Sequence, residues 1–170
     1  MDAVWQRLDL WLRLAMPFFV SLVMALLSAV AWPLPYLGPV MPPLAFIALF
    51  YWAAHRPDLF PVSAAFAIGL LHDIINGLPM GASALLFTGA HQIVLRQRRF
   101  FAGHSFSLLW GGFTLAALAM TVAQWTLVCF LRWQIVPLAP VLTQMVLAAI
   151  FFPLPCWILY QLQRNVLGNI

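Results

Sequence analysis

The sequence predicts an all-α integral membrane protein that crosses the bilayer six times, with both termini in the cytoplasm. First, 65% of the 170 residues are hydrophobic and 7% are charged, whereas soluble domains carry about 25% charged residues. Most apolar side chains must therefore face lipid instead of water. Second, uncharged stretches near the length of a helical span recur along the chain. Third, arginine is distributed unevenly between the connections.

Six apolar stretches are predicted to be the spans. A hydrocarbon core about 30 Å thick needs roughly 20 helical residues. Charged residues, prolines and glycines divide residues 1–170, which we take as a single transmembrane domain, into stretches at about 14–32, 44–54, 61–75, 81–95, 105–131 and 138–162.

The first stretch, 14–32, follows Arg13 and has Pro17 in its first turn, where a missing N–H group loses no hydrogen bond. A signal peptide cleaved after Ala31 is the alternative, but the apolar run is long for one. Residues 33–43 contain five of the thirteen prolines. This segment is therefore expected to lie outside the lipid core.

The second stretch, 44–54, ends in Tyr51 and Trp52, an aromatic pair expected at the membrane interface. The third and fourth stretches, 61–75 and 81–95, are shorter than a comfortable span. They are predicted to form a tight helical hairpin because small residues on both arms allow close approach. A re-entrant hairpin that returns to the same side is the alternative to two full crossings.

The arginines test this topology. With the N-terminus in the cytoplasm, Arg132 is the single arginine outside and the other seven lie inside, as the positive-inside rule expects. A re-entrant hairpin gives the same parity. Arg96, Arg98 and Arg99 are predicted to form a cytoplasmic basic loop that contacts anionic lipid headgroups. The net charge of +4 is too small and too scattered to indicate a nucleic-acid partner.

Asp73 is the acidic residue that falls inside a predicted span. A charge there costs at least about 2.5 kcal/mol on insertion scales, so the residue needs a specific role. One interpretation is a carboxylate that faces a partner or a ligand. The other is a brace that accepts backbone N–H groups near Asn76 and Gly77. We favour the brace because the hairpin backbone needs hydrogen-bond partners at that depth.

Catalytic and metal-binding patterns do not emerge from the sequence. It contains no phosphate-binding glycine loop and no zinc-protease or serine-hydrolase motif. No nucleophile is predicted to face a base. His72 and His91 have no third ligand at helical spacing, so they are expected to be core or interfacial histidines. The sequence therefore predicts neither an enzyme nor a cofactor or metal site.

The segment from about residue 40 to 100 resembles the bacterial rod shape-determining protein MreD family. The resemblance consists of the apolar run ending in Tyr51-Trp52, the polar break at residues 55–58, and then Gly69-x-x-x-Asp73, Gly77 and Gly81. His72 before the aspartate and Pro79-Met80 before the last glycine depart from the pattern. The remaining residues agree in length and hydropathy only.

This resemblance implies a non-enzymatic scaffold in the bacterial inner membrane that serves the cell-elongation machinery, which synthesises peptidoglycan and sets rod shape. Similar proteins associate with MreC, a single-span periplasmic scaffold, and through it with MreB, RodA and a class B penicillin-binding protein. The residues that the resemblance implies for partner binding or hairpin bracing are Asp73, Gly69, Gly77, Gly81, Arg56 and Asp58.

The family's fold also resembles the substrate-binding subunit of energy-coupling-factor transporters, another six-helix protein of similar size. This likeness supplies an alternative function, the binding of a vitamin-like small molecule for transport. In those subunits an Ala-x-x-x-Ala pattern on the first helix docks the transporter module, and Ala25 and Ala29 repeat that spacing. Because fold alone does not fix function, the alternative stays open at the level of the sequence.

Overall fold

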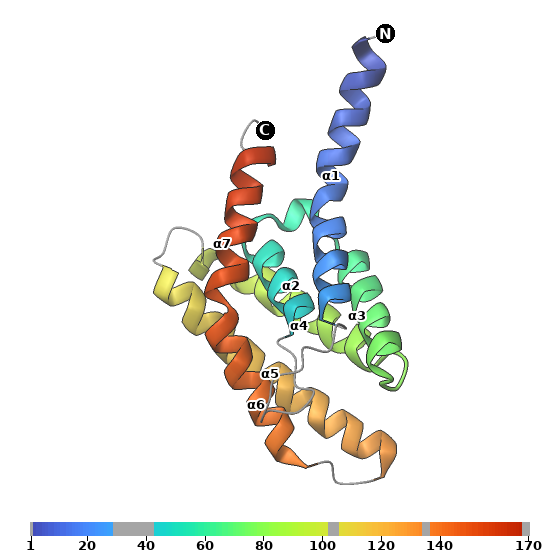
Figure 1. Ribbon diagram of the computed structural model, residues 1–170, viewed down its shortest axis with the longest axis vertical. Helices are drawn as coiled ribbons and strands as arrows, with labels where there is room; N and C mark the ends of the chain where they lie inside the picture. The colour runs from blue at the N-terminus through green and yellow to red at the C-terminus, as the bar shows by residue number, and fades with distance from the viewer. Residues whose placement is uncertain (1, 29–42, 102–105, 134–136, 168–170) are drawn as a thin grey trace.

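The structure, a computed structural model, describes residues 2–28, 43–101, 106–133 and 137–167 (Figure 1). Over these residues it contains helices and no strand, which confirms the all-α prediction. The α-helices are α1 (Asp2–Leu27), α2 (Leu44–His55), α3 (Val62–Asn76), α4 (Ala82–Phe101), α5 (Phe106–Arg132), α6 (Leu138–Phe151) and α7 (Pro153–Leu162). A 3₁₀ turn, η1 (Pro57–Leu59), precedes α3, and a π-helical turn, η2 (Gln163–Leu167), follows α7.

Helix α2 is the centre of the fold. Every residue from Ala45 to Ala54 is buried, because α1, α4, α5 and α7 all pack against it. A helix that is apolar on all sides is stable in such an enclosed position. Its Phe50 ring lies 5.3 Å from the Phe113 ring of α5 and 6.2 Å from that of Phe152, measured between centroids. An aromatic cluster therefore ties α2 to the C-terminal half of the chain.

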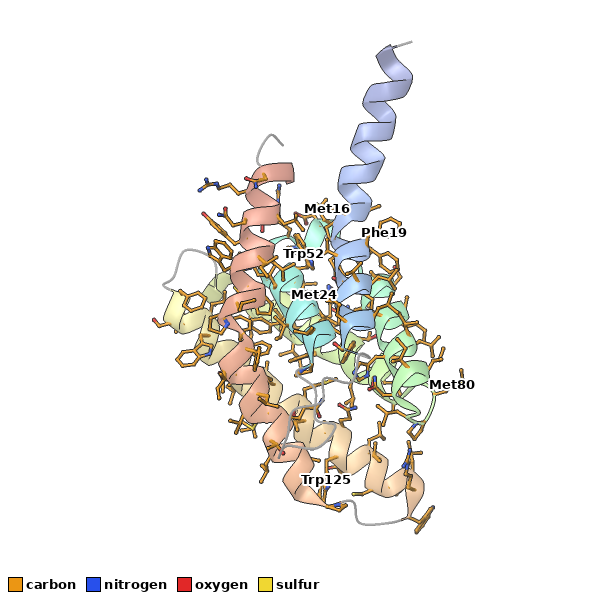
Figure 2. The ribbon with its side chains drawn as sticks, in the orientation of Figure 1. Met16, Phe19, Met24, Trp52, Met80 and Trp125 are labelled. Atoms are coloured by element: carbon orange, nitrogen blue, oxygen red, sulfur yellow. The ribbon has the colours of Figure 1, made fainter. Side chains whose placement is uncertain are left out.

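The expectation that Tyr51 and Trp52 lie at the membrane interface is wrong. Their exposed fractions are 1% and 0%, and Figure 2 shows Trp52 inside the helical assembly. The physical reason is that the neighbouring helices surround α2 up to its C-terminal end. An aromatic pair at the end of an apolar run is compatible with either environment, and here it belongs to the core.

Helix α1 begins well before the predicted first span. It runs from Asp2, so Pro17 lies in the helix interior and not in its first turn. The N-terminal part of α1 extends beyond the other helices (Figure 1). The predicted end of the first span and most of the proline-rich segment 33–43 lie outside the described residues.

Among the described helices, α5 is long and apolar enough to cross a bilayer by itself. Only 11% of its most apolar window is buried, so most of it faces outward. Helices α6 and α7 meet the same criterion when they are taken together as one bent span. Helices α2 and α3 have 12 and 15 residues, fewer than the roughly 20 that a span needs. The six crossings therefore remain a prediction.

The predicted last span, 138–162, is a bent pair of helices and not one continuous helix. The axes of its two parts differ by 46°, with the break at Phe152 and Pro153. Pro153 has no N–H group to donate to the Ala149 carbonyl one turn earlier, and its ring crowds that carbonyl. The indole Nε1 of Trp110 on α5 donates to this oxygen at 2.9 Å. A partner from a neighbouring helix thus replaces the hydrogen bond that the proline removes.

Two long-range hydrogen bonds show which helix ends lie together. Arg132 Nη2 donates to the Gly77 carbonyl at 3.0 Å, which places the end of α5 beside the α3–α4 turn. The Tyr51 hydroxyl donates to Gln163 Oε1 at 2.7 Å, which places the end of α2 beside the end of α7. In Figure 1 the α3–α4 turn lies far from both chain termini.

Candidate functional site: the α3–α4 hairpin

Helices α3 and α4 make backbone contact at Gly69. A Cβ atom added to Gly69 would lie 2.5 Å from the Ala84 Cα and 2.8 Å from the Ser83 carbonyl oxygen. Real Cβ atoms do not approach backbone so closely, so only glycine fits here without moving a helix. This geometry confirms the close approach that the small residues of the hairpin predict.

Asp73 lies four residues further along the same face of α3 and is fully buried. Its Oδ2 accepts a hydrogen bond from the Gly81 N–H at 2.9 Å, and its Oδ1 accepts one from the Ser83 N–H at 2.9 Å. The first N–H groups of a helix have no partner within the helix. A carboxylate there also interacts favourably with the helix dipole. Asp73 on α3 therefore caps the N-terminus of α4.

The two glycines of the turn have backbone angles that other residues rarely adopt. Gly77 ends α3 in the left-handed conformation, with φ 60° and ψ 31°, and Gly81 precedes α4 with φ 93°. The Asp73 carbonyl accepts from the Gly77 N–H and, at 3.0 Å, from the Leu78 N–H. This is the glycine-terminated helix end described for many proteins. These contacts make one structural unit of Gly69, Asp73, Gly77 and Gly81. The spacing of the four residues places each of them at its contact in the hairpin or at its turn.

Sequence reasoning missed several parts of this unit. It placed the donors to Asp73 near Asn76 and Gly77, whereas the carboxylate binds the far side of the turn. Which backbone N–H groups the Asp73 carboxylate can reach depends on where α4 begins. The guanidinium of Arg132 reaches the turn from α5, a contact that no local pattern indicates.

The structure also brings a serine hydroxyl and an imidazole together, which the sequence did not predict. His72 Nδ1 lies 3.3 Å from Ser83 Oγ, and both residues are buried. A cavity lined by His72, Gln124 and Gln144 has a volume of about 20 Å³. That volume suits a single water molecule, whereas ligand pockets measure about 300–1,000 Å³. Over the described residues, this cavity is therefore far smaller than a ligand pocket.

Arg56 and Asp58 are not part of the same site. They flank the start of η1, before α3 begins, whereas Asp73 lies near the other end of α3. Arg56 is half-buried and Asp58 is exposed. The 15 residues of α3 correspond to a length of about 22 Å. The residues that the resemblance groups together therefore occupy opposite ends of the hairpin.

The basic loop predicted at Arg96, Arg98 and Arg99 is wrong as a loop, because α4 continues through these residues to Phe101. Arginine is a good helix former, and neither proline nor glycine interrupts this stretch. Arg96 is exposed, and the side chains of Arg98 and Arg99 lie outside the described residues. Within the described residues, no group of three or more His, Cys, Asp or Glu side chains is arranged to hold a metal ion.

Over the residues that the structure describes, these features define a helical protein consistent with a membrane location, built around a capped hairpin with tightly packed arms. The model of the rod shape-determining protein MreD family matches residues 9–163, and the chain belongs to that family. No curated protein and no solved structure matched the chain. The family is a structural one that takes part in determining rod shape, and its members are membrane proteins.

Proposed function

We propose that this protein is a non-enzymatic inner-membrane scaffold of the cell-elongation machinery that binds MreC within and near the bilayer. The observation that carries the proposal is that the polar groups of the hairpin bind the protein's own helices. The Asp73 carboxylate binds the backbone of α4, and the neighbouring cavity holds about 20 Å³. The site is thus built to hold two helices together, and its outward surface is free for a partner.

The outer face of the hairpin is apolar. Ile74 on α3 and Leu85 and Ile93 on α4 are each more than half exposed. In lipid, such faces associate by close packing with another helix and not by a hydrophobic effect. We therefore assign Asp73, Gly69, Gly77 and Gly81 to bracing and shaping the hairpin, and partner binding to its outer surface.

We propose six crossings with both termini in the cytoplasm. Arg56, Arg96 and Arg164 fall on the side of the connections assigned to the cytoplasm, and Arg132 falls on the other, which supports this topology. The shortness of α2 is compatible with a crossing because protein, and not lipid, surrounds it. Contact with MreB, RodA and a class B penicillin-binding protein would then occur through MreC.

The alternative, a vitamin-binding transporter subunit, has less support. The cavity beside the hairpin, of about 20 Å³, is too small for a vitamin, and a larger groove between α2, α5 and α7 has an apolar floor. Ala25 is 2% exposed and packs into the chain's own core, so it is not free to dock a transporter module. Ala29, the second residue of that pattern, lies outside the described residues.

Co-purification tests the proposal. The protein, solubilised from its native membrane in mild detergent, should bring down an MreC-like single-span protein. Denaturing extraction and mass spectrometry should recover no stoichiometric vitamin-like small molecule. Recovery of a bound vitamin without an MreC-like partner would refute the scaffold function and favour the transporter function.

A further inference from the structure

A groove with a volume of about 380 Å³ lies between α2, α5 and α7. This volume falls within the range of small-molecule sites. Its floor is formed by Tyr51, Leu109 and Cys156, each less than a tenth exposed. The break between α6 and α7 occurs at Pro153, which also lines the groove. The groove is separate from the hairpin site and from the contacts on which the scaffold proposal rests.

The rim of the groove is aromatic. Phe106, Trp157 and Tyr160 line it and are each about half exposed or more. Trp157 and Tyr160 each carry a polar tip, and such side chains are typical of the depth at which lipid headgroups meet the hydrocarbon core. The polar group on the floor, the Tyr51 hydroxyl, already donates to Gln163. The floor therefore offers an apolar surface, which fits hydrocarbon better than a polar ligand.

Two arginines lie close in sequence to residues that line the groove. Arg164 follows Tyr160 by four residues in η2, and Arg56 follows His55, which lines the groove. Asp58 in η1 is the acidic residue of the same connection. Both arginines fall on the side that the positive-inside rule assigns to the cytoplasm. Juxtamembrane arginines there attract anionic headgroups.

We propose that the groove binds one phospholipid of the cytoplasmic leaflet, with an acyl chain on the Tyr51–Leu109–Cys156 floor and an anionic headgroup at Arg164. The apolar floor, the aromatic rim and the cationic end follow one another in the order in which a phospholipid presents chain, interface and phosphate. The site is a property of this chain and does not require MreC.

Native mass spectrometry of the full-length protein tests this proposal, with equimolar phosphatidylglycerol and phosphatidylcholine added to the detergent. The protein should retain one phosphatidylglycerol in preference to phosphatidylcholine. Arg164→Gln should lower that preference about fivefold, the effect expected from one juxtamembrane arginine. Cys156→Phe, which fills the floor, should abolish retention of both lipids.

Matched controls make the result specific. Arg132→Gln removes the same charge at the far end of α5, beside the α3–α4 turn, and should leave the preference unchanged. Thermal unfolding of each variant shows whether it is folded. If Cys156→Phe does not fold, the lipid preference of Arg164→Gln alone tests the proposal. Equal retention of both lipids, an equal loss in Arg132→Gln, or a dimer that excludes lipid from the groove would each overturn the proposal.

Discussion

Replacing Asp73 by alanine should destabilise the protein strongly. The carboxylate is fully buried and accepts hydrogen bonds from two backbone N–H groups, those of Gly81 and Ser83. A hydrogen bond to a charged group contributes about 1.5–3 kcal/mol, and loss of a helix cap costs about 0.5–2 kcal/mol. Because these effects overlap at one helix end, we expect Asp73→Ala to lower the free energy of unfolding by about 3–4 kcal/mol.

Two variants separate the carboxylate from its surroundings. Asp73→Asn keeps one acceptor oxygen but directs an NH₂ group at the second donor, so it should lose about half as much stability as alanine. Ser83→Ala keeps the backbone N–H that Asp73 binds and removes only the 3.3 Å contact to His72. It should therefore change stability by less than about 1 kcal/mol.

Thermal unfolding in detergent, followed by near-ultraviolet circular dichroism, measures these effects. For a chain of this size about 1 kcal/mol corresponds to 2–4 °C, so Asp73→Ala should lower the unfolding midpoint by about 10 °C. Co-purification with MreC, measured well below that midpoint, should be retained. An unchanged midpoint with loss of the partner would refute the brace and identify Asp73 as a partner-binding residue.

Three other substitutions test the packing. Gly69→Ala must separate α3 from α4 near Ala84 and should cost about 1–3 kcal/mol in unfolding free energy. Gly89→Ala has open space at its Cβ, so it should be neutral or stabilising by up to about 1 kcal/mol. Equal effects of the two substitutions would contradict the close approach of α3 and α4. Trp110→Phe leaves the Ala149 carbonyl without its indole donor and should cost about 1–3 kcal/mol; an unchanged unfolding midpoint would show that this oxygen does not depend on the indole.

Helix-breaking and charged residues in the sequence predicted the ends of several helices closely. The bounds of α2, α3 and α5 agree with the predicted stretches to within a residue or so, because prolines, glycines or charges stand at most of their ends. The end of α4 was missed because Arg96 to Arg99 are charged but also form helix well. The bend at Pro153 was missed because the stretch was judged by length and hydropathy, although the proline itself carried the signal.

Contacts between distant segments could not be read from local patterns. We predicted that Asp73 braces the hairpin because buried backbone groups in general need hydrogen-bond partners. Which N–H groups donate to its carboxylate depends on where α4 starts. The burial of Tyr51 and the contact from Arg132 to Gly77 both require knowing which helices become neighbours. The groove beside α7 has the same origin, since it exists only once three helices are assembled.

The most direct test is a labelling experiment that measures on which side of the membrane the α3–α4 turn lies. Met80 is 76% exposed at the α3–α4 turn (Figure 2), and Asp58 is exposed at the other end of α3. In a background with Cys129 and Cys156 replaced by serine, Met80→Cys should react with an impermeant maleimide in cells whose inner membrane is intact. Asp58→Cys should react only after that membrane is opened. Protection of both cysteines in intact cells would contradict a hairpin that crosses the bilayer.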